Sequence, residues 1–368
     1  MIPTHFSQLI GNSLAKSYLQ LMLEKKTIAH SLLFAGPSGV GKSLFASALA
    51  AEIMQLHDPH GLHRQKIEKG HHPDLHIYRP EGKLGLHSLQ SLRQLIEEVY
   101  MPPYEAPWKV IIIHEADRML SYSANALLKT FEEPLAHTLI ILLSHSSVAL
   151  LPTILSRCRT IHFQALEQQE VKNFLCNKFQ LEDDEAQKLA HLARGSLGRA
   201  VKLAEQKGDP YRHALLKILA CQGQEHYQIF TRTIQELVSQ VEQVKKQAEE
   251  QAKEVLYQGP VEDLSAHQQH LLEKELEAAV AMAQWQESQS LLETILFWYR
   301  DLHLLATKGP MPYLLHVDYK EQLEQALQKG KLLSLEKVQK MIEEARLALQ
   351  RSVSLPICLE NLLLKLLP

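Results

Sequence analysis

Hydrophobic and polar positions follow a mixed strand and helix pattern over the first 163 residues. Short, largely apolar runs predict strands at residues 31–35 (SLLFA), 75–78 (LHIY), 109–113 (KVIII), 139–143 (LIILL) and 159–163 (RTIHF). Apolar residues that recur at three- and four-residue steps predict helices at 12–24, 44–55, 86–99 and about 123–132. Alternating strands and helices predict a doubly wound α/β domain, with a parallel sheet covered on both faces.

Beyond residue 163 the strand signals end and the pattern becomes helical. Three short helices are predicted at 171–178, 184–194 and 198–206. Longer helical patterns follow at 235–256, 266–305, 334–350 and 356–367. The sequence therefore predicts three domains, which are an α/β domain at 1–163, a small helical domain at 164–208 and an all-α domain at 209–368.

Composition narrows the class of protein. The 368 residues are 45% hydrophobic and carry a formal net charge of -3. The chain as a whole therefore lacks the excess of positive charge that is typical of nucleic-acid-binding proteins. Any DNA contact must be local or shared with partner chains. The four cysteines are scattered without C-x-x-C spacing, which predicts reduced thiols in a cytoplasmic protein. With no signal-peptide pattern and no apolar run near 18 residues, we expect no membrane contact.

One motif satisfies the phosphate-loop pattern G-x-x-x-x-G-K-[ST] without a mismatch. Its residues are Gly36, Pro37, Ser38, Gly39, Val40, Gly41, Lys42 and Ser43. A predicted strand precedes it and a predicted helix follows, which disfavours a chance glycine turn. We expect its N–H groups to bind the phosphates of ATP, Lys42 to reach the β- and γ-phosphates, and Ser43 to hold Mg²⁺.

The 109–113 strand ends in His114, Glu115, Ala116 and Asp117. At this place a P-loop ATPase usually has an aspartate that holds Mg²⁺, followed by a glutamate that polarises water. Glu115 fits the second role, but His114 replaces the aspartate, and a neutral imidazole is a poor ligand for Mg²⁺. Nucleotide binding with weak or absent hydrolysis is the expectation. Alternatively, Glu115 and Asp117 only cap the following helix.

Four blocks of sequence resemble a known family. They are AHSLLFAG at 29–36, KGHHPDLH at 69–76, ANALLKTFEEP at 124–134 and LPTILSRC at 151–158. In this order they are similar to the clamp-loader branch of the AAA+ ATPases, and within it to the delta-prime family of DNA polymerase III subunits. The resemblance implies an AAA+ domain, a helical lid and a helical collar. It also implies partners, namely gamma/tau-like ATPase and delta-like subunits, the sliding clamp and primed DNA.

The resemblance also implies roles for single residues. Arg157, within Ser156-Arg157-Cys158, matches an arginine finger that acts in trans on a neighbouring subunit's nucleotide. Ser144 and His145 lie where the family senses the γ-phosphate. Motor subunits have an arginine where Gly198 stands, and Arg199 comes one position later, turned by about 100° on a helix. Without the resemblance, a salt bridge at a helix end is the favoured interpretation of Arg157.

Many relatives carry a four-cysteine zinc module after the loop helix. No cysteine of this chain falls there, and the histidines of the region are His57, His60, His63, His71, His72 and His76. All-histidine zinc sites are uncommon, so we expect a solvated loop without zinc.

Two functions of different class remain open. The first is a delta-prime-type accessory subunit that presents Arg157 to a neighbouring motor, within the DNA polymerase III holoenzyme. The second is an active gamma/tau-like ATPase motor that uses Lys42, Ser43 and Glu115. An unrelated P-loop kinase or transferase has no support beyond the shared loop.

Overall fold

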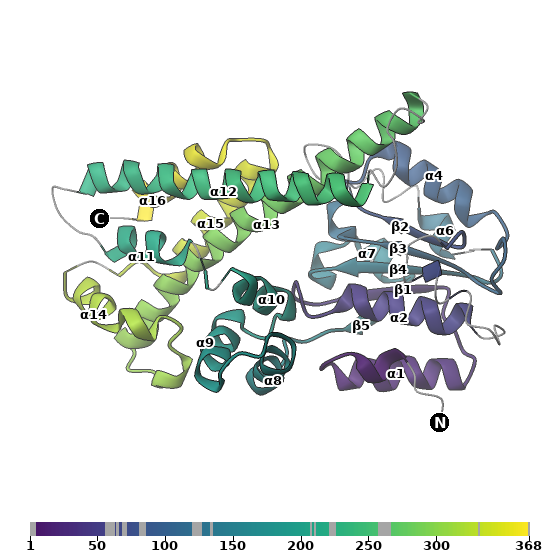
Figure 1. Cartoon of the computed structure of the whole chain (residues 1–368), viewed down its shortest axis with the longest axis horizontal. Helices are drawn as coiled ribbons and strands as arrows, with labels where there is room; N and C mark the ends of the chain where they lie inside the picture. The colour runs from purple at the N-terminus through teal and green to yellow at the C-terminus, as the bar shows by residue number, and fades with distance from the viewer. Residues whose placement is uncertain are drawn as a thin grey trace. The chain divides into compact units, whose positions relative to one another are not determined.

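The computed structural model describes residues 5–55, 63, 66–67, 72–80, 86–119, 127–132, 135–206, 208–209, 211–220, 226–256, 266–329 and 332–366. These residues form two compact units, one up to residue 206 and one from 208 onward. Figure 1 labels the helices and strands of both units.

The first unit contains one sheet of five strands. They are β1 (Ser31–Ala35), β2 (Leu75–Tyr78), β3 (Lys109–Ile113), β4 (Thr138–Ser144) and β5 (Arg159–His162). Their order is β2-β3-β4-β1-β5 and every pairing is parallel, which confirms the predicted parallel sheet. β4 is longer than predicted because Ser144 still pairs with Ala35 at the end of β1.

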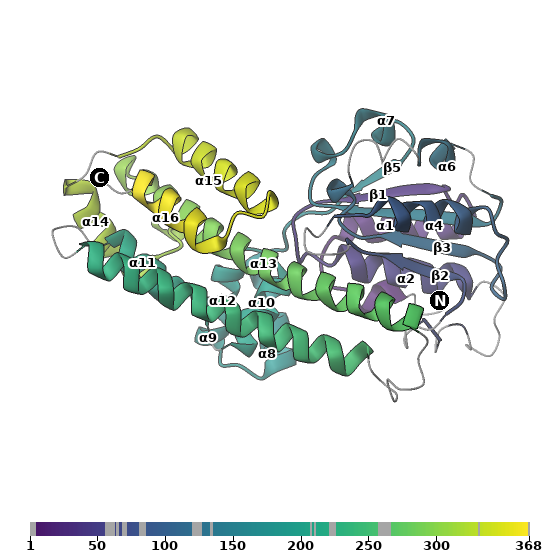
Figure 2. The ribbon, with the colours of Figure 1, turned by 90° about the horizontal axis from the view of Figure 1, so that it is seen from above.

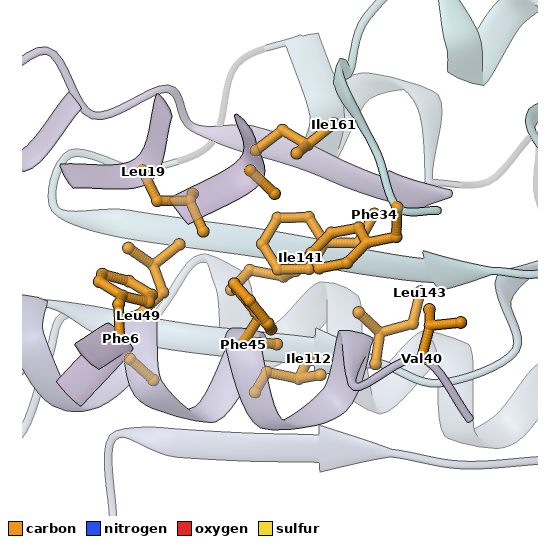
Figure 3. Close-up of a cluster of buried hydrophobic side chains, with 14 of the residues drawn as sticks. Phe6, Leu19, Phe34, Val40, Phe45, Leu49, Ile112, Ile141, Leu143 and Ile161 are labelled. Atoms are coloured by element: carbon orange, nitrogen blue, oxygen red, sulfur yellow. The ribbon is translucent and has the colours of Figure 1, made fainter. Parts of the chain in front are cut away.

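Side chains of the sheet point alternately to two buried faces. On β1, Leu32 and Phe34 join the first hydrophobic cluster, whereas Leu33 and Ala35 join the second. The first face is covered by α1 (Ser13–Glu24) and α2 (Lys42–Met54), and Figure 3 shows this cluster. The second face is covered by α4 (Leu89–Val99), α6 (Leu128–Glu132) and α7 (Pro152–Leu155). The predicted coverage of both faces is therefore confirmed.

Local capping explains where two helices begin. α4 begins at Leu89 rather than at 86, because the Ser88 hydroxyl oxygen accepts a 3.0 Å hydrogen bond from the Ser91 N–H. α2 begins directly after Gly41, whose positive φ of 98° is a conformation that glycine adopts at little cost. Residues 123–126 of the helix predicted at 123–132 lie outside the described residues.

Three helices follow the sheet, close to their predicted positions. They are α8 (Gln168–Phe179), α9 (Asp183–Ala193) and α10 (Leu197–Glu205). α8 begins earlier than residue 171, because Glu167 and Glu170 form a capping box at its start. All three helices contribute to the hydrophobic cluster that contains Phe34 and α2. Residues 164–206 thus belong to the first unit, and a separate domain at 164–208 stays a prediction.

The second unit is helical in the residues that the structure describes, as predicted. Its helices are α11 (Arg212–Ala220), α12 (His226–Leu256), α13 (Ala266–Ala306), α14 (Lys320–Lys329), α15 (Leu335–Gln350) and α16 (Leu355–Leu366). Figure 2 shows α12 and α13 side by side. α12 begins well before the predicted residue 235, because Phe230 and Ile234 extend the buried face of Leu237 and Val241. Among the described helices, none combines the length and apolar character that a membrane span requires.

Candidate functional site

The phosphate-loop motif connects the carboxyl end of β1 to the first turn of α2. The Gly36 N–H donates a 3.2 Å hydrogen bond to the Ser144 carbonyl oxygen, which continues the β1–β4 pairing into the loop. Gly39 and Gly41 both have positive φ, of 73° and 98°. These turns bring the loop to the N-terminus of α2, where free N–H groups and the helix dipole favour an anion.

Lys42 lies across the loop that precedes it. Its ammonium donates 2.6 Å hydrogen bonds to the carbonyl oxygens of Gly36 and Pro37. Burial lowers the pKa of Lys42 to about 8, although the carboxylates of Asp117 and Glu115 partly oppose the shift. The structure therefore brings the predicted lysine together with the two acids after β3.

Asp117 joins the ends of two neighbouring strands. Its Oδ1 accepts hydrogen bonds from the Ser144 hydroxyl (3.0 Å) and the His145 N–H (3.3 Å), and the His145 ring also contacts the carboxylate. Burial would raise the pKa of Asp117, but these hydrogen bonds outweigh it and hold the pKa at about 2. Considered at first only as a helix cap, Asp117 is the acid that anchors both predicted phosphate-sensing residues.

Glu115 occupies the turn between β3 and the short 3-10 helix Ala116–Arg118. Its φ is 48°, and its side chain makes no cap hydrogen bond to that helix, so helix capping does not explain it. The Arg118 guanidinium lies 3.5 Å from its carboxylate. Burial raises the pKa of Glu115, with Arg118 opposing the shift. A carboxylate with a raised pKa is better suited to accept a proton than an ordinary surface glutamate.

His114 is a neutral group at the position where Mg²⁺ would need an anion. Burial lowers its pKa to about 4, and the positive charges of Arg79 and His87 act in the same direction. The carbonyl oxygen of His114 lies 2.7 Å from His87 Nε2. At neutral pH this imidazole is therefore uncharged, and it offers Mg²⁺ no anionic ligand. The loop thus fits a phosphate group, whereas the β3 end is less suited to Mg²⁺ than an aspartate would be.

The N-terminal end of α10 lies directly against the phosphate loop. The Gly198 N–H donates a 3.0 Å hydrogen bond to the Gly39 carbonyl oxygen. A Cβ atom added to Gly39 would lie only 2.2 Å from Ser196 Oγ. Arg199 is the third residue of the same helix, and its N–H donates a 3.2 Å hydrogen bond to the Ser196 hydroxyl oxygen. Contact of Arg199 with nucleotide stays a prediction.

Asn12 is a residue of this region that the sequence analysis missed. Its Oδ1 accepts a 2.8 Å hydrogen bond from the Gln164 N–H, and its Nδ2 lies 3.5 Å from the Val40 carbonyl oxygen of the loop. Asn12 thereby ties the start of α1 to the loop and to the segment after β5. The sequence feature that could have pointed to Asn12 is its place directly after Gly11, because such a pair is typical of tight backbone turns.

Arg157 lies apart from these groups, in the turn after α7. Its contacts are with Glu132, Thr153 and Ser156, on the sheet face that α6 and α7 cover. The predicted site residues therefore fall into two sets. The loop, Glu115 and Ser144 come together at the carboxyl ends of the strands, and Arg157 lies among the helices of the second face.

His63, His72 and Glu105 form a compact polar cluster in the first unit. His63 Nδ1 lies 2.9 Å from His72 Nε2, and Glu105 Oε1 lies 3.5 Å from the same atom. The Asp74 N–H donates to His72 Nδ1 at 3.0 Å, so the proton of the neutral ring is on Nε2. A protonated nitrogen offers no lone pair to a metal, and Lys66 also pairs with Glu105. The geometry favours a hydrogen-bonded cluster.

The expectation of a solvated loop is wrong at His72, because this residue of the cluster is buried. Residues 57, 60 and 71 of the candidate histidines lie outside the described residues.

Comparisons with known proteins bear on the same part of the chain. Residues 11–167 match the family model described as "DNA polymerase III, delta subunit". Subunit delta' of DNA polymerase III from Bacillus subtilis (strain 168) is 32% identical over 203 residues, which cover 54% of this chain and 60% of the relative. The resemblance inferred from the four sequence blocks is thereby confirmed for the part that carries both sets of site residues.

Two further similar proteins are also named after DNA polymerase III. The tau subunit of DNA polymerase III from Escherichia coli (strain K12) is 32% identical over 215 residues, 55% of this chain and 33% of the relative. Among solved structures, a DNA polymerase III gamma subunit-related protein from Thermotoga maritima aligns with 94% of this chain and 97% of its own, at 17% identity and a TM-score of 0.43. The chain thus spans less than two thirds of the Bacillus and Escherichia relatives that it matches.

Proposed function

We propose that this chain is a delta-prime-type subunit of a DNA polymerase III clamp loader. In this role it helps to load a sliding clamp onto primed DNA, together with gamma/tau-like and delta-like subunits. Its own contribution is to present Arg157 to the nucleotide site of a neighbouring ATPase subunit, where a guanidinium neutralises charge in the transition state.

The observation that carries this proposal is the separation of Arg157 from the chain's own phosphate loop. The guanidinium contacts residues of α6 and α7, on the sheet face away from α2. An arginine in that place serves a nucleotide of another chain more readily than its own.

The chain's own nucleotide chemistry is proposed to be weak. Gly36 to Ser43 would hold the phosphates, with Lys42 and the Ser43 hydroxyl nearest to them, and ATP with Mg²⁺ would supply the transferable γ-phosphate. Glu115 would accept a proton from water. The neutral His114 leaves the metal with one anionic ligand fewer than a motor subunit has, so phosphate binding without efficient hydrolysis is expected.

An active gamma/tau-like motor is the second candidate. It is favoured by the convergence of a complete loop, Lys42, Glu115 and Asp117 in one place. ATP turnover of the isolated chain separates the two. Turnover near 1 s⁻¹ or above, lost in Lys42→Ala, would establish a motor. The accessory proposal expects turnover at the level of the Lys42→Ala control.

A second measurement tests the arginine directly. In a loader reconstituted with its ATPase subunits, Arg157→Ala is expected to lower DNA-stimulated turnover by about 10³-fold at the site it serves. Arg159→Ala is the matched control, since Arg159 lies two positions further and stacks on the Tyr18 ring at 4.7 Å. Unchanged turnover with Arg157→Ala would show that the finger assignment is wrong.

The remaining parts of the proposal concern organisation. We propose a P-loop domain at 1–163, a lid at 164–208 and an oligomerisation collar at 209–368, in a cytoplasmic assembly. Contacts of the sliding clamp and DNA with this chain belong to the same proposal.

A further inference from the structure

The Arg157 guanidinium is engaged at both ends within its own chain. Its Nε donates a 2.5 Å hydrogen bond to Glu132 Oε1, and one terminal nitrogen also contacts this carboxylate. The other terminal nitrogen donates to the Thr153 carbonyl oxygen (2.9 Å) and the Ser156 hydroxyl (3.1 Å). The Nε and both terminal nitrogens are therefore already in contact with groups of the same chain.

The fold brings these two side chains together. Glu132 is the last residue of α6, and Arg157 follows α7 by two residues. Phe131 and Ile154, which flank them, are buried in the same hydrophobic cluster on the second face of the sheet. The backbones that carry the pair are thus fixed by packing, while both side chains stay partly exposed, at 31% for Arg157 and 45% for Glu132.

Such an exposure decides what the pair can do. Partly exposed ion pairs contribute little to folding stability, so this contact is poorly suited to a structural role. It is well suited to a reversible one, because a phosphate carries more negative charge than a carboxylate and binds a guanidinium in the same bidentate manner.

We infer that Glu132 is a positioning residue that holds Arg157 in a resting orientation and competes for it with the phosphate of a neighbouring subunit's nucleotide. The inference rests on the proposed function of Arg157 and adds its regulation. Arg157 leaves Glu132 only when the phosphate competes successfully for its guanidinium. Nucleotide bound in the neighbouring subunit therefore determines the orientation of the Arg157 side chain.

The test uses Glu132→Gln, which keeps the side-chain size and removes the charge. In the reconstituted loader, DNA-stimulated kcat is expected to rise about two- to fivefold at low salt, since a competing ion pair of this kind is weak. The rise should shrink at high salt and disappear in the Glu132→Gln/Arg157→Ala double variant, which should equal Arg157→Ala alone. Glu185→Gln, which removes an exposed charge from α9, is the control.

An unchanged or lowered kcat in Glu132→Gln, while Arg157→Ala still abolishes stimulation, would overturn the inference and leave the finger intact. If Arg157→Ala has no effect, the finger assignment fails, and the competitive role of Glu132 with it.

The contact itself is read separately in the isolated chain, from the ¹⁵Nε–H NMR signal of Arg157, assigned with Arg157→Lys. Glu132→Gln is expected to shift this signal and to speed its hydrogen exchange. A signal identical in wild type and variant would overturn the resting contact, whatever the loader assay gives.

Discussion

The Gly198 N–H donates a 3.0 Å hydrogen bond to the carbonyl oxygen of Gly39, and so joins the first turn of α10 to the phosphate loop. Gly39 leaves no room for a side chain at this contact, and Gly198 leaves little. A Cβ atom on Gly198 would lie 3.2 Å from Gly39 Cα, which is closer than most such contacts. Gly198, where the resemblance predicts an arginine in motor subunits, therefore serves here as a packing contact on the loop.

This contact predicts that Gly39→Ala destabilises the first unit. The new methyl group would meet Ser196 Oγ at 2.2 Å, and alanine at a φ of 73° adds backbone strain. Together these effects are expected to cost about 1–3 kcal/mol of unfolding free energy. Urea unfolding of the full chain, followed by a probe in the first unit, measures it. Gly39→Ala/Ser196→Gly should recover part of the loss, and full stability in Gly39→Ala would contradict the described packing.

The lowered pKa of Lys42 predicts pH-dependent nucleotide binding. Its charge is lost as the pH rises through about 8, so ADP affinity should fall about tenfold between pH 7 and pH 9. Fluorescence titration with a labelled ADP measures this dependence. Lys42→Arg, which stays charged, should show a flat profile. The same decline in Lys42→Ala, whose binding should be weak throughout, would assign the pH dependence to another group.

The lowered pKa of Asp117 predicts that the stability difference between the wild type and an Asp117 variant depends on pH in the acid range. Its pKa is about 2 in the folded chain and 3.8 as the ordinary value, so its contribution is present above pH 3.8 and is lost as the pH falls toward 2. Asp117→Asn is expected to lower the free energy of unfolding by at most about 2 kcal/mol at pH 7. Urea unfolding at pH 7 and pH 2.5 compares the two proteins.

Glu97→Gln, which changes an exposed carboxylate of α4, is the control for general charge effects. A difference between wild type and Asp117→Asn that is as large at pH 2.5 as at pH 7 would mean that packing, rather than charge, explains the loss. Removing Asp117 should also move the pH midpoint of ADP binding below 8, because its carboxylate favours the charged form of Lys42.

Cys158 is expected to be an unreactive thiol although it neighbours Arg157. It is buried, and burial raises its pKa to about 12, so little thiolate forms at pH 8. Alkylation of the native chain followed by mass spectrometry should label Cys176, which is only partly buried, well before Cys158. Urea should remove the difference. Equal labelling of both thiols in the native chain would show that the segment after α7 opens readily.

The sequence predicted the five strands and the parallel sheet because continuous apolar runs such as 109–113 leave little choice of structure. The phosphate loop was equally clear, since its glycines, lysine and flanking elements occur at fixed spacing. Helix starts were less accurate. At α4 the decisive signal was one hydroxyl, that of Ser88. At α12 the predicted helix left out Phe230 and Ile234, although they continue the apolar spacing of Leu237 and Val241.

The connections between site residues could not be predicted from spacing. Asp117 and Ser144 lie 27 positions apart in sequence, and their contact follows from the pairing of β3 with β4. The link from Asn12 to Gln164 spans 152 positions and depends on the whole first unit being folded. The pairing of Arg157 with Glu132 likewise requires that α6 and α7 cover one face of the sheet. Sequence identified the residue types, and only the fold determined their partners.

The placement of the phosphate loop and Arg157 on different sides of the sheet gives an assembly a direction. In a dimer related by a two-fold axis, both subunits use the same surface at their contact. Because the arginine and the loop lie on different surfaces, such a contact could not place the arginine of each subunit at the loop of the other. Subunits that use this pairing must instead add head to tail. An open row of this kind has two unlike ends, one with an arginine and the other with a loop that faces no neighbour.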